Sequence, residues 1–223
     1  MENIMKFDAN TLQVLKNFSS INKNIMFKTG NVIRTISDTK SVMAKSTIKQ
    51  EIPKSFGIYD LSRFLGTLTL FNEAELDIQD SVVEIKEGNN KFKYALSDAS
   101  LIMVAPDRDI ALPDPEIEFV LTQEALNQVM KALSVSQLPH IAVTGDGTTI
   151  YLQAIDAEGK THDAYSVEVG STSANFRMVF RADNIKLIPG NYNVQISAKG
   201  LSHFTGTNVE YWIAVESSST YQG

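Results

Sequence analysis

The stretch Pro106-Asp-Arg-Asp-Ile-Ala-Leu-Pro-Asp-Pro115 divides the 223-residue chain into two halves of similar length. Its three prolines favour an extended path and prevent regular backbone hydrogen bonding, so the segment is typical of a linker. A chain of this length suits either one large domain or two domains of about 110 residues each. We therefore expect an N-terminal domain at residues 1–105, a connector at residues 106–115 and a C-terminal domain at residues 116–223.

The half before this connector contains two helix patterns. The first begins at Asn10-Thr11 and repeats apolar residues at helical spacing, namely Leu12, Leu15, Phe18 and Ile21. Its polar face contains Lys16, Ser20 and Lys23, which are expected to share one exposed ridge. The second helix is expected to begin after the N-cap Asp60 and to reach Phe71, with Arg63 and Thr67 on its polar side. Strands are expected at residues 31–36, 42–48, 76–78, 81–86, 91–96 and 101–105.

The half after the connector repeats this order. Thr122 is expected to cap a helix whose apolar face contains Ala125, Leu126, Val129, Met130 and Leu133. A second, short helix is expected to begin at Asp183 and to end at Pro189-Gly190, with Lys186 pointing outward. Strands are expected at residues 116–121, 141–144, 148–152, 165–169, 176–180, 192–197 and 210–215. The whole pattern predicts an α+β tandem repeat.

The charge is unevenly distributed along the chain. The net formal charge of −6 argues against nucleic acid as a partner, because contacts with phosphate supply most non-specific affinity. However, residues 9–50 contain seven cations and the single acid Asp38, whereas residues 106–124 contain six acids and the single cation Arg108. One surface could therefore be positive on an acidic molecule. The alternative is a chance run of solvated lysines.

The sequence lacks the usual signs of catalysis, cofactor binding or membrane insertion. It contains no cysteine, which excludes disulfide scaffolds and thiolate zinc sites, and its three histidines are dispersed. No apolar run approaches the roughly 18 residues that a membrane-spanning helix needs, and the N-terminus has no secretion signal pattern. We expect no enzymatic activity, no catalytic residue, no metal and no cofactor. A nuclease would need clustered carboxylates with metal-ligand spacing, and none is found.

Five short motifs, found in the same order along almost the whole chain, resemble segments of the T4-type bacteriophage sliding clamp. They are Leu15-Lys16-Asn17-Phe18 with Ile21-Asn22, Ile58-Tyr59-Asp60-Leu61 with Phe64-Leu65-Gly66, Val104-Ala105-Pro106, Pro189-Gly190-Asn191-Tyr192 and Ala198-Lys199-Gly200. The resemblance implies a DNA polymerase processivity factor with two similar clamp domains per chain. Three chains would form a closed homotrimeric ring, with helices lining the central hole and antiparallel sheets outside.

Such a ring encircles duplex DNA without reading its sequence. A modest positive lining would attract phosphate while still letting the ring slide, and acidic outer sheets would steer DNA toward the hole. The resemblance and the polar helix faces together assign the DNA-facing role to Lys16, Lys23, Arg63, Lys131 and Lys186. The alternative for each of them is an ordinary solvated side chain.

The resemblance also implies two protein-binding regions. Rings of this family close by pairing edge strands of neighbouring chains, for which we expect residues 91–96 and 163–169, with contacts from Lys91, Phe92, Tyr94, Leu96, Tyr165 and Val167. The alternative is that these are ordinary strands inside their own sheets. Family partners dock short peptides beside the connector, for which we expect Ile110, Leu112, Trp212, Ala214 and Val215. The alternative for Trp212 is a buried core residue.

The resulting hypothesis is a clamp that tethers a phage DNA polymerase to its template and is opened by an ATP-dependent clamp loader. The family also links replication to late transcription, which implies phage late-transcription factors and host RNA polymerase as further partners. The expected location is the cytoplasm of the infected bacterial host. The alternative is an oligomeric virion structural protein, which would not be expected to place acid-free polar faces on four helices.

Overall fold

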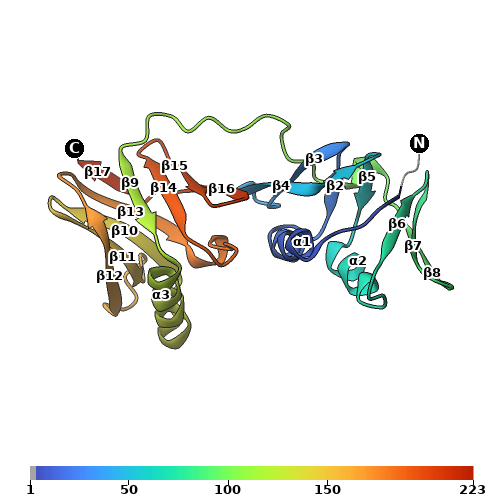
Figure 1. The fold of residues 1–223 in the computed structure, drawn as a ribbon. Helices are drawn as coiled ribbons and strands as arrows, with labels where there is room; N and C mark the ends of the chain where they lie inside the picture. Colours follow the sequence, from blue (N-terminus) through green and yellow to red (C-terminus); the bar gives the residue numbers. More distant parts are fainter. Residues whose placement is uncertain (1–3, 223) are drawn as a thin grey trace. The chain divides into compact units, whose positions relative to one another are not determined.

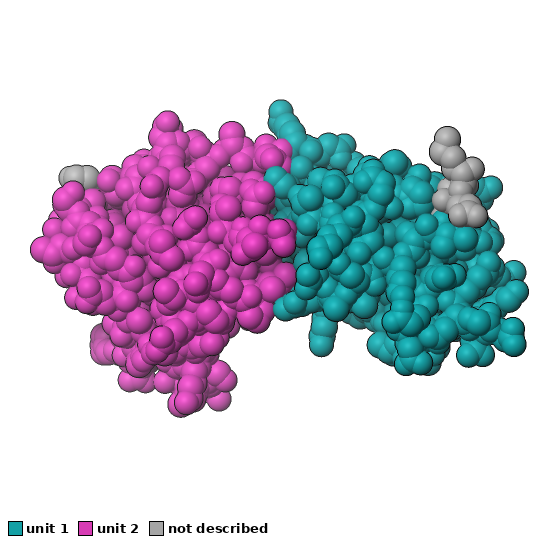
Figure 2. Space-filling model, in the orientation of Figure 1, with its two compact units in different colours: residues 1–108 teal, residues 109–223 magenta. Residues whose placement is uncertain are grey.

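A computed structural model describes residues 4–222 and divides the chain into two compact units, residues 1–108 and residues 109–223 (Figure 2). The boundary between the units lies inside the segment 106–115 that the prolines mark as a connector. Each unit has its own buried core, and each combines antiparallel strands with helices. Among the described residues, no helix is long and apolar enough to cross a membrane.

Unit 1, residues 1–108, contains two α-helices, α1 (Ala9–Ile21) and α2 (Leu61–Leu68), which pack against each other (Figure 1). Helix α1 also contacts a long antiparallel hairpin of two strands. Four other strands form an antiparallel sheet in the order β1-β6-β7-β8, and β2 pairs with β5. The strands are β1 (Ile4–Met5), β2 (Ile25–Phe27), β3 (Gly30–Ile36), β4 (Val42–Ile52), β5 (Phe56–Ile58), β6 (Glu75–Ile78), β7 (Val82–Glu87) and β8 (Asn90–Ala95).

The apolar periodicity of the two helices explains the core of unit 1. Leu15 and Phe18 of α1 and Leu61 and Phe64 of α2 are fully buried, and Phe27 of β2 stacks on neighbouring aromatic rings. Burial of such side chains contributes about 1.5–3 kcal/mol each, so packing stabilises helices as short as α2.

Unit 2, residues 109–223, contains one α-helix, α3 (Gln123–Ser136), which lies against β11 and β12 (Figure 1). One antiparallel sheet has the strand order β12-β11-β10-β13-β17, and the strands β16, β15, β14 and β9 are successive neighbours in another. The strands are β9 (Ile117–Leu121), β10 (His140–Asp146), β11 (Thr149–Ile155), β12 (Ala164–Ser171), β13 (Asn175–Arg181), β14 (Tyr192–Ser197), β15 (Leu201–Thr205), β16 (Val209–Ala214) and β17 (Thr220–Gln222).

Two of the expected elements are wrong. The strand expected at residues 101–105 is instead a single 3-10 turn, Ala99–Leu101, followed by irregular chain, because the side chain of Asp98 accepts the backbone N–H of Ser100 and caps the turn. The short helix expected from Asp183 is only one 3-10 turn, Ala182–Asn184. Helix α2 also ends three residues before Phe71, and β15 is a strand that the patterns did not indicate.

Candidate nucleic-acid interface

Helix α1 presents a polar face that is exposed along its length. The carboxylate of Asp8 caps the helix by accepting the backbone N–H of Thr11 at 2.8 Å, and this hydrogen bond lowers the pKa of Asp8. Lys16 and Lys23 are exposed, but α1 ends at Ile21, so Lys23 lies on the turn that follows rather than on the helical ridge. The buried side chain in the first turn is Thr11, whose hydroxyl donates to the side chain of Gln50, and not Leu12, which is only half-buried.

Helix α2 begins beside the segment that follows α1 and presents Arg63 on its surface. The Asp60 carboxylate caps α2 by accepting the backbone N–H of Arg63 at 2.8 Å, and the N–H of Leu61 donates to the carbonyl of Lys23 at 2.7 Å. Arg63 is exposed, as the polar pattern predicts. Thr67 is buried, contrary to that pattern, because its hydroxyl donates to the carbonyl of Arg63 at 2.9 Å and needs no water.

In unit 2, only one of the two cations that were expected on helices lies on a helix. Lys131 is exposed on α3, whose first turn is capped by the Thr122 hydroxyl. Lys186 is half-buried and does not lie on a helix, because only one 3-10 turn forms before it. The prediction that Lys186 projects from a helical face is therefore wrong.

The reason lies in the hydrogen bonds of the segment that follows the 3-10 turn. The backbone N–H of Ile188 donates to the hydroxyl of Tyr211 at 3.1 Å, and the hydroxyl of Tyr192 donates to the carbonyl of Ile188 at 2.5 Å. Both backbone polar groups of Ile188 are thus bound by side chains from β14 and β16 instead of by helical partners.

The cations of residues 9–50 are spread over several elements. Only Lys16 and Lys23 lie on or beside α1, whereas Lys28, Arg34, Lys45 and Lys49 lie on or beside the strands β2, β3 and β4. Arg34 and Lys45 are cross-strand neighbours in the β3–β4 hairpin. The cations of this stretch therefore lie on different elements, because the chain turns from helix to strand after Ile21.

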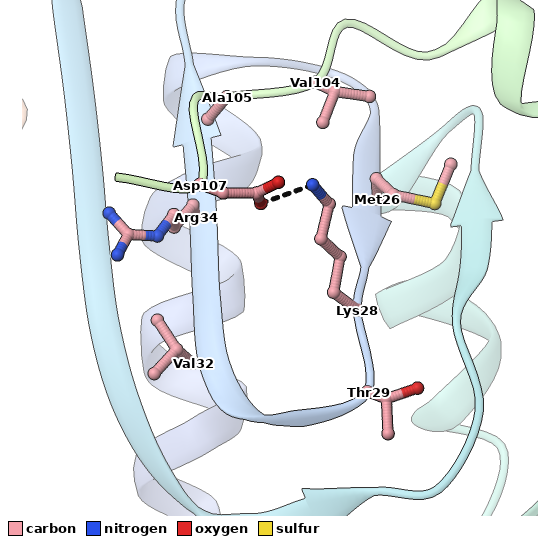
Figure 3. A pocket seen from close by; sticks show the side chains of 8 residues that line it. All are labelled: Met26, Lys28, Thr29, Val32, Arg34, Val104, Ala105 and Asp107. Atoms are coloured by element: carbon pink, nitrogen blue, oxygen red, sulfur yellow. Dashed lines mark hydrogen bonds and ion pairs between the residues drawn. The ribbon is translucent and has the colours of Figure 1, made fainter. Parts of the chain in front are cut away.

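A hollow of about 260 Å³ in unit 1 shows how one of these strand cations is engaged (Figure 3). Lys28 forms an ion pair with the carboxylate of Asp107, and the hydrogen bond from Lys28 lowers the pKa of Asp107. The hollow mixes charged and apolar walls: Met26, Lys28, Thr29, Val32, Arg34, Val104, Ala105 and Asp107. Lys28 is therefore paired with the beginning of the connector and does not lie on a helical surface.

The strands expected to join neighbouring chains both lie at the edges of their own sheets. Strand β8 is the last strand of the order β1-β6-β7-β8, and β12 is the first of β12-β11-β10-β13-β17. On β8, Lys91 and Phe92 are exposed while Tyr94 is buried. On β12, Tyr165 is 42% exposed and Val167 is half-buried. Leu96 lies just beyond β8 and is half-buried.

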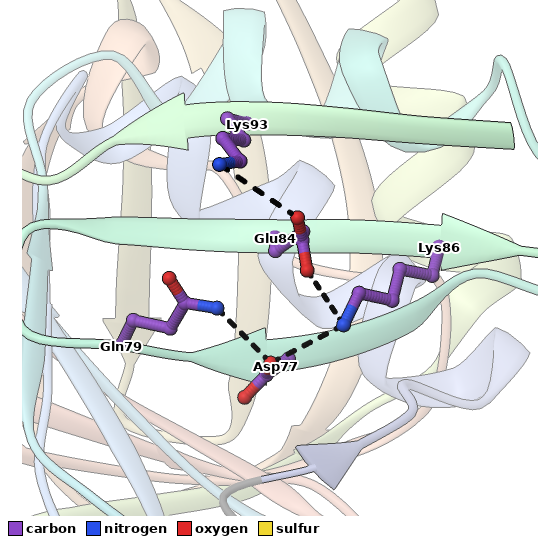
Figure 4. Close-up of polar contacts among 5 residues, drawn as sticks. All are labelled: Asp77, Gln79, Glu84, Lys86 and Lys93. Carbon is purple, nitrogen blue, oxygen red and sulfur yellow. Dashed lines mark hydrogen bonds and ion pairs between the residues drawn. The ribbon is translucent and has the colours of Figure 1, made fainter.

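An ion-pair ladder crosses the sheet next to the β8 edge (Figure 4). Lys86 lies 2.6 Å from the carboxylate of Glu84 and 3.4 Å from that of Asp77, and Lys93 lies 4.0 Å from the other oxygen of Glu84. The hydrogen bond from Lys86 lowers the pKa of Glu84. Two cations thus surround the nearly buried Glu84, and both are paired with carboxylates of the same sheet.

The residues expected to bind partner peptides do not form one open pocket. Trp212 is only 2% exposed, and its ring stacks on that of His203 with 4.5 Å between the centroids. Its placement matches the alternative of a buried residue. Val215 lines a hollow of about 220 Å³ beside β13 and β17, but the other residues of the set do not line it. Ile110, Leu112 and Ala214, which do not line this hollow, are half-buried.

The sequence patterns missed the aromatic rings that lie beneath two of the DNA-facing candidates. Lys23 lies over the ring of Tyr59, and Arg63 lies over that of Tyr94. Tyr59 directly precedes the Asp60 cap, so its position beside the helix was visible in the sequence. The partnership with Lys23 was not, because it depends on how two helices pack. Among the described residues, no group of three or more His, Asp or Glu side chains could hold a metal ion.

Comparison with solved structures places this fold in a known class. The chain is similar to PCNA from A. fulgidus, solved with the C-terminal region of FEN-1, with a TM-score of 0.71 and 16% identity over 96% of this chain and 98% of that one. It is also similar to DNA polymerase III subunit beta from Borrelia burgdorferi, with a TM-score of 0.72 and 10% identity over 96% of this chain and 64% of that one. The fold is therefore that of the clamp proteins.

Comparison of sequences identifies the family. A family model described as DNA polymerase processivity factor matches residues 7–102, and one described as gp45 sliding clamp, C terminal, matches residues 118–217. The sliding clamp of Vibrio phage KVP40 is 33% identical over 95% of this chain and 99% of its own length. That of Enterobacteria phage T4 is 30% identical over 97% and 99%, respectively. The chain belongs to the family of phage sliding clamps, which are DNA polymerase processivity factors.

Proposed function

We propose that copies of this chain close head to tail into a trimeric ring by pairing β8 of one copy with β12 of the next. The observation behind the proposal is that β8 and β12 are edge strands with complementary charge. Lys91 and Lys93 lie on β8, whereas Glu168 lies on β12 and Asp163 just before it, and all four side chains are exposed. Backbone pairing of two edges with opposite charge also discourages pairing of like edges.

Apolar side chains beside both edges support the same pairing. Next to β8, Leu101 and Phe92 are 61% and 36% exposed. Next to β12, a hollow of about 640 Å³ is bordered by Val135 and Tyr165, and Val135 is 76% exposed. Exposed apolar groups gathered at a sheet edge are typical of a protein interface.

In this proposal the ring encircles duplex DNA, with Lys16, Lys23, Arg63 and Lys131 facing the phosphates, and tethers the phage polymerase to its template. Encirclement needs only weak, sequence-independent attraction, since the closed ring supplies the retention. The ring has no catalytic activity of its own. An ATP-dependent loader opens it in the cytoplasm of the infected bacterium, and late-transcription factors with host RNA polymerase use it as well. The virion alternative loses its basis, since the matching families are clamps.

Charge reversal at the two edges tests the ring. A chain with Lys91→Glu and Lys93→Glu should shift toward monomer by at least about tenfold in its assembly constant, because like charges then meet across the interface. Adding Asp163→Lys and Glu168→Lys to the same chain should restore the trimer. Sedimentation analysis measures the mass, and retention on circular but not linear DNA measures encirclement.

A control variant reverses one exposed lysine on another strand, with Lys49→Glu on β4. The proposal is wrong if the edge variant remains a trimer, or if the fourfold variant stays as dissociated as the double one. Equal retention of the wild-type ring on linear and circular DNA would contradict encirclement itself.

A further inference from the structure

The end of α1 and the beginning of α2 meet around an exposed tyrosine. Tyr59 is 50% exposed although it lies directly before the cap of α2. The ammonium of Lys23 lies 5.3 Å from the centroid of its ring. The backbone is fixed at the same place, because the N–H of Leu61 donates to the carbonyl of Lys23 at 2.7 Å. The cation and the ring are therefore held together by main chain as well as by attraction to the ring face.

A second cation, on α2, lies over another tyrosine ring, which belongs to β8. The guanidinium carbon of Arg63 lies 5.8 Å from the ring centroid of Tyr94. Tyr94 is fixed in turn, since its hydroxyl donates to the carbonyl of Asp60 at 3.0 Å and its ring packs edge-on against Phe64 at 5.1 Å. Burial raises the pKa of Tyr94, so this hydroxyl stays protonated as a donor.

The other helical cations are supported differently. In the part of the chain that the structure describes, Lys16 on α1 and Lys131 on α3 are exposed without an aromatic ring beneath them. A free lysine loses rotamer freedom when it binds phosphate, which weakens the contact. A lysine already held over a ring has lost part of that freedom, and the ring attracts its charge without neutralising it.

We propose that Tyr59 is a positioning residue for DNA: its ring holds the Lys23 ammonium at the start of α2, where it contacts the phosphate backbone. The inference rests on the proposed DNA-facing role of these cations and adds an uncharged residue to it. It implies that DNA affinity depends on a side chain with no charge at all. A surface that worked through net charge alone would not respond to changes at Tyr59.

Tyr59→Leu tests the inference, because it removes the ring and leaves every charge in place. The assembled ring should bind duplex DNA about two- to fivefold more weakly at low salt, as expected for the loss of one exposed cation–aromatic contact. In a Lys23→Ala background the same substitution should have no further effect, since the cation that it positions is gone. Fluorescence anisotropy with a labelled duplex across a salt series measures both results.

Three variants make the outcome decisive. Tyr59→Phe keeps the ring and should bind like the wild type, and Tyr151→Leu on β11 is a matched loss of a tyrosine ring outside the helices. The inference is overturned if Tyr59→Leu binds like the wild type, if its effect adds fully to that of Lys23→Ala, or if Tyr59→Phe is equally weak. If Lys23→Ala and Arg63→Ala also leave binding unchanged, the proposed DNA-facing role fails with it, and this result is distinct from failure at Tyr59 alone.

Discussion

The two units of the chain repeat one architecture but differ at the place where a second helix is expected. In unit 1 the cap Asp60 is followed by Leu61, Phe64 and Leu68, all buried, and α2 forms. In unit 2 the pattern after Asp183 ends at Pro189 after less than two turns, and only a 3-10 turn forms. A short apolar pattern with a cap is thus insufficient, because helix nucleation is costly and must be offset by packing.

This difference changes how the DNA-facing charge is distributed. Unit 1 has three exposed candidate cations on or beside its helices, namely Lys16, Lys23 and Arg63. Unit 2 has Lys131 on α3, while Lys186 is half-buried on irregular chain. Repetition of the fold therefore does not mean repetition of the surface, and we expect unit 1 to make most of the phosphate contacts.

The largest expected effect comes from replacing the candidate cations of each unit in separate variants. Lys16→Ala, Lys23→Ala and Arg63→Ala together should weaken binding of the ring to duplex DNA by about tenfold or more, and the plot of log affinity against log salt should lose about 0.9 in slope per contact removed. Lys131→Ala with Lys186→Ala should lower affinity by a smaller factor. Anisotropy titrations between low and physiological salt measure both. Equal losses from the two sets would show that the units contribute alike.

A smaller effect should follow in unit 2 from removing the Tyr211 hydroxyl, which accepts the backbone N–H of Ile188 in place of a helical carbonyl. Tyr211→Phe leaves the backbone N–H of Ile188 without its acceptor, which should lower the free energy of unfolding by about 1–3 kcal/mol. Tyr221→Phe is a control on β17, where the ring is half-buried and stacks on Phe176, and it should change this free energy by less than about 0.5 kcal/mol. Urea denaturation at pH 8 compares the variants, and similar values for both would contradict this role of Tyr211.

The buried side chains of Tyr192 and Tyr211 predict a loss of stability in alkali. Burial raises the pKa of Tyr192 to about 12 and also raises that of Tyr211. The unfolded chain releases these protons near pH 10, so above that value it binds fewer protons than the folded chain, and folding becomes less favourable. The stability present below about pH 10 should therefore decline toward pH 12, less steeply in Tyr211→Phe. A flat profile over this range would contradict the burial.

The smallest expected effect is a gain in unit 1. A methyl group at Gly66 would meet no atom within 4 Å, so Gly66→Ala should raise the free energy of unfolding by about 0.5–1 kcal/mol through helix propensity alone. Gly88 is the control, since it is equally open but has a φ of +56°. There an alanine should cost about 1–2 kcal/mol. Thermal denaturation distinguishes the two, and a loss at Gly66 would show that α2 has a packing constraint not visible in the fold.

Much of the local structure could be predicted from the sequence. The caps Asp60 and Thr122, the helices after them and the strands β7 and β8 lie where capping residues and spacing indicate. These features depend on residues close in sequence. The motifs that resemble phage sliding clamps indicated the family, which the comparisons confirm. The assignments of individual residues to DNA, to neighbouring chains and to partner peptides remain predictions.

The errors arise where distant residues compete with local preference. The helix expected around Lys186 does not form, because Tyr211 and Tyr192, from strands that follow it, bind the backbone of Ile188. Trp212 was proposed for an open pocket, but it is stacked on the cross-strand neighbour His203. Neither outcome can be derived from spacing, because each depends on which strands become neighbours.

The sequence by itself determined the connector, the α+β class and the family, since prolines, caps and apolar periods act over a few residues. Only the tertiary structure decided which cations share a surface. The basic stretch of residues 9–50 is spread over α1 and the strands β2, β3 and β4, while Lys23 and Tyr59 come together from separate segments. The physical reason is that a charge is fixed in the sequence, but its neighbours are set by the packing of the core beneath it.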